Sequence, residues 1–207
     1  MARLTQTLEG IARCPHCGIA NPQLVMRWHS QQHTPHAIGP GNMWAAYSCT
    51  RCGGVVTAKG ANNDGTSNAE IIAVFPAAKE AHADIPEPAR KFLQQAYETL
   101  HAPDAAAVMA GSAVDGMLKA LGYKDGNLYG RIDQAVKDQK LTAGMGDWAH
   151  EVRLGSNRPR HSDESEPHVS PEQAAQSVEF AEALGYFLFV LTKRIESGLA
   201  AAKTSKQ

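Results

Sequence analysis

The hydrophobic positions follow two different periods along the chain, and the change falls near residue 85. Before that point apolar and polar residues tend to alternate, as they do in a half-buried β-strand. Val, Trp and Tyr, which favour strands, are frequent there. The pattern predicts strands over residues 24–29, 43–48, 55–57 and 70–75, with a loop rich in Pro, Gly and His over 31–42 and a polar turn over 60–67.

After residue 85 the apolar residues recur every three or four positions, as on one face of an α-helix. Pro86 and Pro88 mark the first helix start, and Gly122 is placed to end the second helix. Small residues on the inner face of the second helix, such as Gly111, should let another helix approach closely. The pattern predicts four helices, over residues 86–100, 103–122, 127–136 and 141–153.

A fifth helix has the clearest start signal in the sequence. Ser170 is followed by Pro171 and Gln173, which together form a capping box with proline at the first helical position. The helix then runs to Leu191 with an apolar surface wider than a single stripe, so we expect it to be central or to lie at an interface. Residues 199–207 are expected to fray.

Composition and charge narrow the class of protein. With 207 residues there is room for one large or two small domains, and a formal net charge of −1 gives no global basic field to attract nucleic acid. The N-terminus has no apolar run typical of a signal peptide, and the apolar stretch 184–191 is too short for a membrane span. These features predict a cytoplasmic protein without a membrane anchor, whose cysteines stay reduced and favour metal over disulfide.

All four cysteines lie in two C-x-x-C-G segments, with Cys14 and Cys17 in the first and Cys49 and Cys52 in the second. Two residues between thiolates let one turn direct both sulfurs at a single ion, and the following glycine allows the backbone conformation that this turn needs. Four thiolates complete a tetrahedral Zn²⁺ site with no open position for substrate. We therefore predict a structural zinc site, whose binding folds residues 10–60.

Other interpretations of the cysteines remain open at this point. They could be four buried thiols or a redox dithiol, although one C-x-x-C would suffice for redox chemistry and no βαβ pattern surrounds it. A histidine could replace one cysteine as a ligand; the candidates are His16, His29, His33 and His36.

A polar segment over residues 153–164 is the other candidate for chemistry. Arg153, Arg158, Arg160 and His161 fall within nine residues and are followed by acids. Arginine can bind phosphate, and histidine can move a proton near neutral pH. Gly155 and Pro159 are expected to break the helix in this segment. The alternative is a solvated loop in which arginine caps a helix and the acids pair with the arginines.

The cysteine pairs, the Ile85-Pro86 entry to a helical bundle and the Arg153…Asn157…His161 segment together resemble an uncharacterised prokaryotic family, domain of unknown function 4145, of the HEPN superfamily. The resemblance covers about residues 12–195. It implies an α+β, mainly α fold: a small N-terminal β zinc ribbon over residues 1–78, a HEPN-like bundle of four to five helices over 79–200, and a disordered tail over 201–207.

The resemblance also implies a homodimer in which the Arg and His segments of two chains face each other. Active HEPN members cut RNA without metal. By similarity His161 would transfer protons, Arg153 or Arg158 would stabilise the charged phosphorane, and Asn157 would position the segment. Here seven residues separate Arg153 from His161, more than in catalytic members, and the apolar Leu154 follows the arginine.

That departure favours a zinc-binding module that recognises a protein or nucleic-acid partner in a defence or regulatory system. The alternative is a metal-independent RNA endonuclease that uses the same segment in a dimer.

The remaining aromatic residues fit a structural role. Tyr97 and Trp148 are expected in the helical core, and Trp28 and Trp44 are expected to pack around the zinc module rather than stack on bases.

Overall fold

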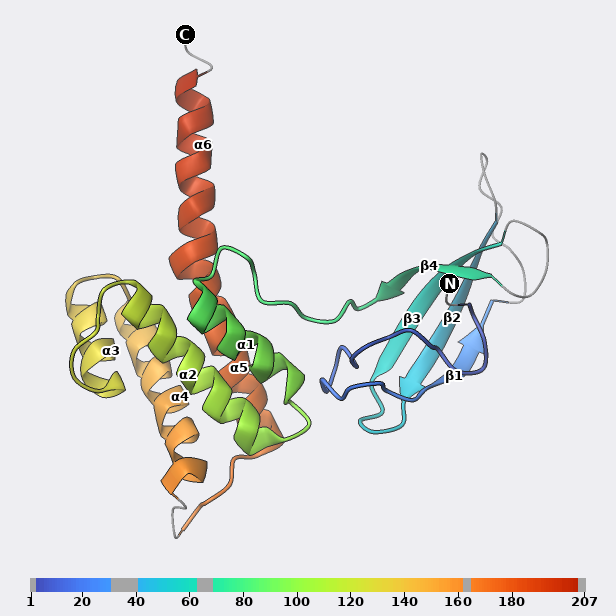
Figure 1. Cartoon of the computed structure of the whole chain (residues 1–207), viewed down its shortest axis with the longest axis horizontal. Helices are drawn as coiled ribbons and strands as arrows, with labels where there is room; N and C mark the ends of the chain where they lie inside the picture. Colours follow the sequence, from blue (N-terminus) through green and yellow to red (C-terminus); the bar gives the residue numbers. More distant parts are fainter. Residues whose placement is uncertain (1–2, 31–40, 63–68, 162–164, 205–207) are drawn as a thin grey trace. The chain divides into compact units, whose positions relative to one another are not determined.

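The computed structural model describes residues 3–30, 41–62, 69–161 and 165–204, and the chain divides into two compact units, Met1–Lys79 and Glu80–Gln207 (Figure 1). The first is a small antiparallel β-sheet and the second a helical bundle. The predicted fold class, α+β and mainly α with the sheet first, is confirmed.

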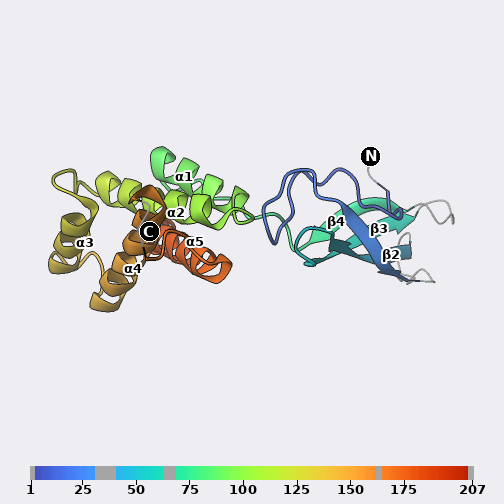
Figure 2. The ribbon, with the colours of Figure 1, turned by 90° about the horizontal axis from the view of Figure 1, so that it is seen from below.

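The N-terminal unit is a four-stranded sheet in the order β1-β2-β3-β4 (Figure 1). Figure 2 shows the same sheet from below, with β2, β3 and β4 labelled. All neighbouring pairs are antiparallel, and each predicted strand is present. The predicted strand over 55–57 extends further because its alternation continues through Ala58 and Lys59. The strands are β1 Leu24–His29, β2 Gly41–Cys49, β3 Val55–Asn62 and β4 Glu70–Phe75.

The sheet buries one face only. Leu4 and Leu8 of the N-terminal segment pack on that face, and their amides donate to the carbonyls of Ala69 and Leu24. Alternate residues along the strands, such as Tyr47, complete this small core. The other side chains of the strands face away from the core, in agreement with the period of two. The full set of buried core residues is Leu4, Leu8, Cys14, Leu24, Met43, Ala45, Tyr47, Cys49, Val56, Ala58 and Ala69.

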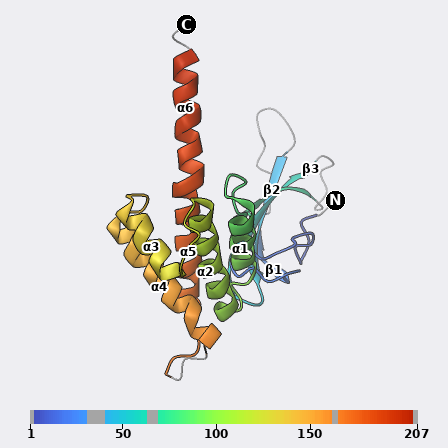
Figure 3. The same cartoon turned by 60° about the vertical axis from the view of Figure 1, so that its left-hand side comes forward.

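The C-terminal unit is built around α2, which packs against α1, α4 and α5 (Figure 3). Small residues permit this packing: a Cβ on Gly111 would lie 2.5 Å from the Ser156 Oγ of α4, and one on Gly116 would lie 3.2 Å from the Ala89 backbone of α1. The expected close helix approach is therefore present. The helices are α1 Glu87–Glu98, α2 Pro103–Ala120, α3 Leu128–Lys137, α4 Ala143–His161, α5 Pro171–Gly185, η1 Tyr186–Leu191 and α6 Thr192–Thr204.

The last helix is continuous from Pro171 to beyond residue 199, although η1 is a wider, π-type turn. The predicted capping box is present, since the Ser170 hydroxyl accepts from the Gln173 amide and the Gln173 side chain accepts from the Ser170 amide. The helical segment Pro171–Lys203 is long enough to cross a membrane and contains an apolar window of 18 residues with mean hydropathy 1.2. Half of that apolar window is buried in the bundle, as in the core helix of a globular unit.

Two aromatic expectations differ from the structure. Tyr97 is buried in the helical core, as predicted. Trp148 is 41% exposed at the surface, where its ring packs against Phe180 at 4.8 Å. Trp28 and Trp44 lie on the side of the sheet that faces away from the small core. The expected packing on the N-terminal module is present for Trp44, which contacts Phe75, whereas Trp28 is 58% exposed.

Candidate functional site

The two C-x-x-C-G segments form matching turns. The Gly18 amide donates to the Cys14 carbonyl over 2.9 Å, and the Gly53 amide donates to the Cys49 carbonyl over 2.8 Å. Both glycines have a left-handed backbone, with φ of +72° and +74°. This is the conformation that the sequence predicted for the residue after each pair, and glycine adopts it without strain.

The two turns bring all four cysteine sulfurs together. The Sγ atoms of Cys14, Cys17, Cys49 and Cys52 all lie within 4.8 Å of one another, and the Cys14 and Cys52 sulfurs are 3.9 Å apart. Sulfurs about 2.3 Å from a central ion at the corners of a tetrahedron lie about 3.8 Å from each other. The cluster therefore fits a tetrahedral metal ion, and the sulfurs are too far apart for disulfides.

Electrostatics at the cluster also suit a cation. Burial raises the pKa of the Cys17 thiol to about 12 and raises the pKa of Cys14. Burial opposes ionisation of Cys49 as well, but hydrogen bonds from the Cys52 and Arg51 amides outweigh it and lower its pKa. A bound cation would compensate the buried thiolate charge, so binding would release protons.

The histidines considered as ligands are not part of this cluster where the structure describes them. The His16 ring donates from Nε2 to the Val55 carbonyl over 2.8 Å and packs against Gly54. His29 interacts with the Ser30 carbonyl through Nδ1. His33 and His36 lie outside the described residues.

The second candidate site is built on α4, which is longer than expected. Gly155 and Pro159 do not break the helix, which continues to His161. Pro159 lies in the last turn, where the amide that it lacks removes a single helical hydrogen bond. Residues 153–161, where a break in the helix was expected, are therefore helical, and Arg153, Asn157 and Arg160 recur at intervals of four and three on one face.

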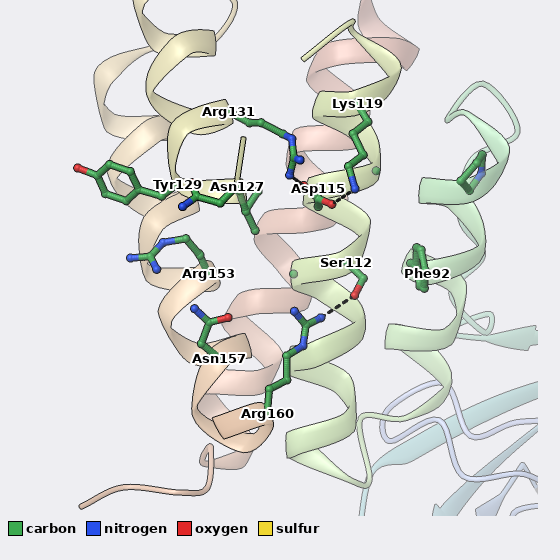
Figure 4. Close-up of a pocket in the computed structure, with 14 residues that line it drawn as sticks. Phe92, Ser112, Asp115, Lys119, Asn127, Tyr129, Arg131, Arg153, Asn157 and Arg160 are labelled. Atoms are coloured by element: carbon green, nitrogen blue, oxygen red, sulfur yellow. Dashed lines mark hydrogen bonds and ion pairs between the residues drawn. The ribbon is translucent and has the colours of Figure 1, made fainter. Parts of the chain in front are cut away.

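That face of α4 opens onto a pocket of about 540 Å³ in the helical unit (Figure 4). Its walls come from α1 and α2, from the start of α3 and from α4. The volume lies within the usual range for small-ligand sites. The residues that line it are Pro88, Phe92, Gly111, Ser112, Asp115, Gly116, Lys119, Asn127, Leu128, Tyr129, Arg131, Arg153, Asn157 and Arg160.

Positive charge exceeds negative charge around the pocket. Asp115 pairs with both Arg131 and Lys119, at 2.6 Å each, so one carboxylate serves two cations. Arg160 donates to the Ser112 hydroxyl over 2.9 Å, which is a neutral acceptor, and it has no carboxylate partner within the described ranges. Arg153 also lacks a carboxylate partner among the residues described, so the pocket is suited to an anion.

An aromatic side chain helps to position Arg153. Its guanidinium lies over the Tyr129 ring at 5.3 Å, and the other neighbour of that ring is His150 at 4.7 Å. His150 in turn contacts the Asp133 carboxylate at 3.0 Å. The Nε of Arg153 is buried and has no hydrogen-bond partner in the described part of the chain. A buried N–H group without an acceptor destabilises the fold, and a bound anion that accepts from this Nε would remove the penalty.

The structure separates the four residues proposed for catalysis. Arg153 and Asn157 line the pocket, whereas Arg158 lies on another side of α4 and pairs with Glu166 at 2.9 Å. His161 is exposed at the end of α4 and is not among the pocket residues. It lies eight residues after Arg153, about 12 Å along a helix axis. Asp163 and Glu164, the other acids expected to pair with the arginines, lie outside the described residues.

Three pocket cations were not identified from the sequence as members of one site. Arg160 could have been, because its spacing from Arg153 and Asn157 places all three on one face once the helix is extended. Lys119 has a weaker signal, the spacing of four from Asp115. Arg131 has no local signal, since only the packing of α3 brings it to α2.

Among the comparisons with known proteins, the comparison with family models gives a match. Neither the curated proteins nor the solved structures yielded a match. The family model described as Domain of unknown function (DUF4145) matches residues 93–200, which include most of the helical unit and the whole pocket face of α4 but not the cysteine cluster. Because this match spans more than half of the sequence, the chain belongs to the DUF4145 family.

Proposed function

We propose that the chain is a zinc-stabilised, HEPN-like recognition module that holds a phosphate group of an RNA partner in the pocket of its helical unit. The carrying observation is the α4 face, where Arg153, Asn157 and Arg160 line one pocket. Two guanidinium groups, for which the described part of the chain supplies no carboxylate partner, and one amide form a donor-rich wall. Guanidinium groups match phosphate oxygens in geometry as well as charge.

The size and lining of the pocket favour a nucleotide unit over a free inorganic ion. Tyr129 and Phe92 supply aromatic surface beside the cations, and the volume of about 540 Å³ exceeds what a phosphate alone would fill. Asn127 and Asn157 add amide groups that can accept from or donate to sugar and base edges. RNA is therefore the partner class that these groups fit best.

Zinc is the metal that we propose for the cysteine cluster. Four thiolates in tetrahedral reach suit Zn²⁺ and leave no coordination position for substrate, so its role is structural. Metal analysis of freshly purified protein should find one zinc ion per chain. A content well below this, with the protein folded, would contradict the assignment.

RNA cleavage within a single copy is not supported by the separation of Arg153 and His161 along α4. An endonuclease would need His161 from a second copy to reach a phosphate held by Arg153. Two results would therefore have to occur together: a solution mass of twice 22.2 kDa, and cleavage that is lost on His161→Ala.

The test is binding of fluorescently labelled RNA, followed by anisotropy without added divalent cation. Arg153→Ala and Arg160→Ala should each weaken binding by about tenfold or more, since each removes a charge-assisted hydrogen bond. Arg158→Ala is the matched control, because it removes an arginine from the same helix that pairs with Glu166 outside the pocket. Equal losses for all three variants would mean that the charge of the helix matters and the pocket does not.

The same samples test cleavage. Intact RNA with the wild-type chain would support the recognition role. RNA cut by the wild type but not by His161→Ala would replace it with the nuclease.

A further inference from the structure

The exposed face of the N-terminal sheet carries aromatic and cationic side chains together. Trp28 is 58% exposed and Phe75 is 49% exposed, on the two outer strands β1 and β4. Trp44 of β2 packs against Phe75 with ring centroids 6.2 Å apart, and the Lys59 ammonium lies 5.9 Å from the Trp44 ring. We call Arg27, Trp28, Trp44, Lys59 and Phe75 the open-face cluster.

Strand register places these residues on one face. Trp28 pairs with Ala46, Ala46 with Thr57, and Thr57 with Phe75, so one row crosses all four strands. The two residues in the middle of this row are small, and the large rings lie at its ends. Adjacent strands lie about 4.8 Å apart, so the backbones of β1 and β4 are about 14 Å apart, and only small side chains lie between the two ring-bearing positions of this row.

A β-bulge adds a cation to the same face. The register of β1 shifts between Met26 and Trp28, so Met26 still contacts the small core while Trp28 faces outward. Arg27 lies at the bulge and donates from Nε to the Ser48 hydroxyl over 2.7 Å, which directs it along the open face as well. A regular strand would have placed these neighbouring residues on opposite faces.

The charges of the N-terminal unit favour an anionic ligand for the open-face cluster. The unit over residues 1–79 contains six Arg and Lys residues but three Asp and Glu residues, whereas the helical unit contains fourteen and eighteen. Within the four strands Glu70 is the single carboxylate, and it pairs in register with Ala61 at the start of β4. The open-face cluster itself contains the cations Arg27 and Lys59 and no acid, so the surface beside its aromatic rings is locally positive, which suits a polyanion.

We propose that the open-face cluster is a binding surface for single-stranded nucleic acid, with bases stacked on Trp28 and on the Trp44–Phe75 pair and phosphates near Arg27 and Lys59. Aromatic side chains on a sheet with flanking cations bind unpaired bases, because every base has a flat face to stack and every linkage has a charge. A duplex offers no free base faces. The proposal does not rest on the pocket of the helical unit.

The experiment uses the full-length, zinc-loaded chain and labelled single strands of about fifteen nucleotides, oligo-uridine and oligo-deoxyuridine, beside a duplex of the same length. Fluorescence anisotropy should show both single strands binding more tightly than the duplex. Trp28→Leu and Phe75→Leu should each weaken single-strand binding roughly tenfold, because leucine keeps apolar area but cannot stack. Trp28→Phe should stay near wild type, and the two single strands will show whether the 2′-hydroxyl contributes.

Two controls establish that the open-face cluster itself binds the strand. Tyr186→Ala removes an exposed aromatic side chain of the helical unit and should leave binding unchanged. Repeating the series in an Arg153→Ala, Arg160→Ala background separates the cluster from the pocket: the Trp28→Leu loss should persist there. Binding equal in wild type and Trp28→Leu would overturn the proposal. So would a dimer that dissociates on Trp28→Leu, since a second copy would then cover the face.

Discussion

At the scale of single residues, the cysteine turns depend on backbone conformation more than on contacts. Gly53 has a φ of +74°, and a Cβ placed there would meet nothing within 4 Å. Gly53→Ala therefore tests conformational strain alone, which costs roughly 1–2 kcal/mol for a left-handed residue with a side chain. We expect about tenfold weaker metal binding in a chelator competition.

Gly53→Asn is the matched variant, because asparagine tolerates the left-handed region better than alanine does. Its metal affinity should lie between that of the wild type and that of Gly53→Ala. Wild-type affinity in Gly53→Ala would show that the turn does not require this conformation.

Asp104 joins the start of α2 to the segment that precedes α5. Its carboxylate accepts from the Val169 amide over 2.8 Å and lies 2.7 Å from His168 Nδ1. The Val169 hydrogen bond lowers its pKa below the ordinary value, with a smaller contribution from His168. A lowered carboxyl pKa stabilises the fold above the ordinary value, and this stability is lost as the pH falls through the lowered pKa.

Asp104→Asn should accordingly lower the free energy of unfolding at neutral pH, by about 1 kcal/mol. The difference from wild type should shrink as the pH falls below about 4, where the carboxyl protonates in the unfolded chain. Urea unfolding at a series of pH values measures this. A difference that is constant with pH would show that the charge of Asp104 is irrelevant.

At the scale of elements, the contact between α2 and α4 holds the pocket walls together. Gly111 lies against Ser156, so Gly111→Ala would force atoms to within 2.5 Å and should destabilise the fold by roughly 1–3 kcal/mol. Gly144→Ala is the control, because a Cβ there meets nothing within 4 Å. It should be neutral or stabilising by up to about 1 kcal/mol.

Thermal unfolding of both variants gives the comparison. The double variant Gly111→Ala, Ser156→Gly should regain part of the loss, since it removes the side chain that the new methyl group meets. No recovery would assign the effect to something other than this contact.

The same helix shows what the sequence could and could not predict. Periodicity located the four strands and the helices α1 to α5, because an element that buries one face must repeat its apolar residues at its own period. It did not locate α6, whose described side chains from Thr192 to Lys203 are all exposed. Gly155 and Pro159 were interpreted as the end of α4, but packing of Ser156 and Val152 against the bundle outweighs their local preference. Because that end was misplaced, Arg160 was not grouped with Arg153 and Asn157.

The two candidate sites differ in how far they could be predicted. The cysteine ligands were identified because their geometry is encoded within two short segments. The outward position of Trp28 and Trp44 could not be predicted in this way, because alternation shows that one face of a strand is buried but not which face. The bulge at Arg27 also shifts the phase of β1 and leaves no trace in the spacing of apolar residues.

At the scale of the whole molecule, the two units have separate cores. Cys14 and Cys49 belong to the small core of the sheet and none of the cysteines to the core of the helices. Small cores of this kind depend on metal for much of their stability, on the order of 10 kcal/mol in short zinc modules. Removal of the metal should therefore unfold the first unit and spare the second.

Calorimetry with and without a strong chelator tests this. One transition should move to lower temperature or disappear, while the transition of the helices and most of the helical circular dichroism remain. A single transition that shifts as a whole would show that the units fold as one.

The long last helix has a further consequence, for hydrogen exchange. Every side chain described in α6 from Thr192 to Lys203 is exposed, and the helix extends beyond the other helices of its unit (Figure 1). A free helix of 13 residues is barely stable in water. Amides of α6 should thus exchange with deuterium within seconds, by local opening of the helix. Amides of α5, whose inner face is buried, should exchange only when the bundle unfolds. Slow exchange along α6 in the wild-type chain would reveal a surface that covers it in solution.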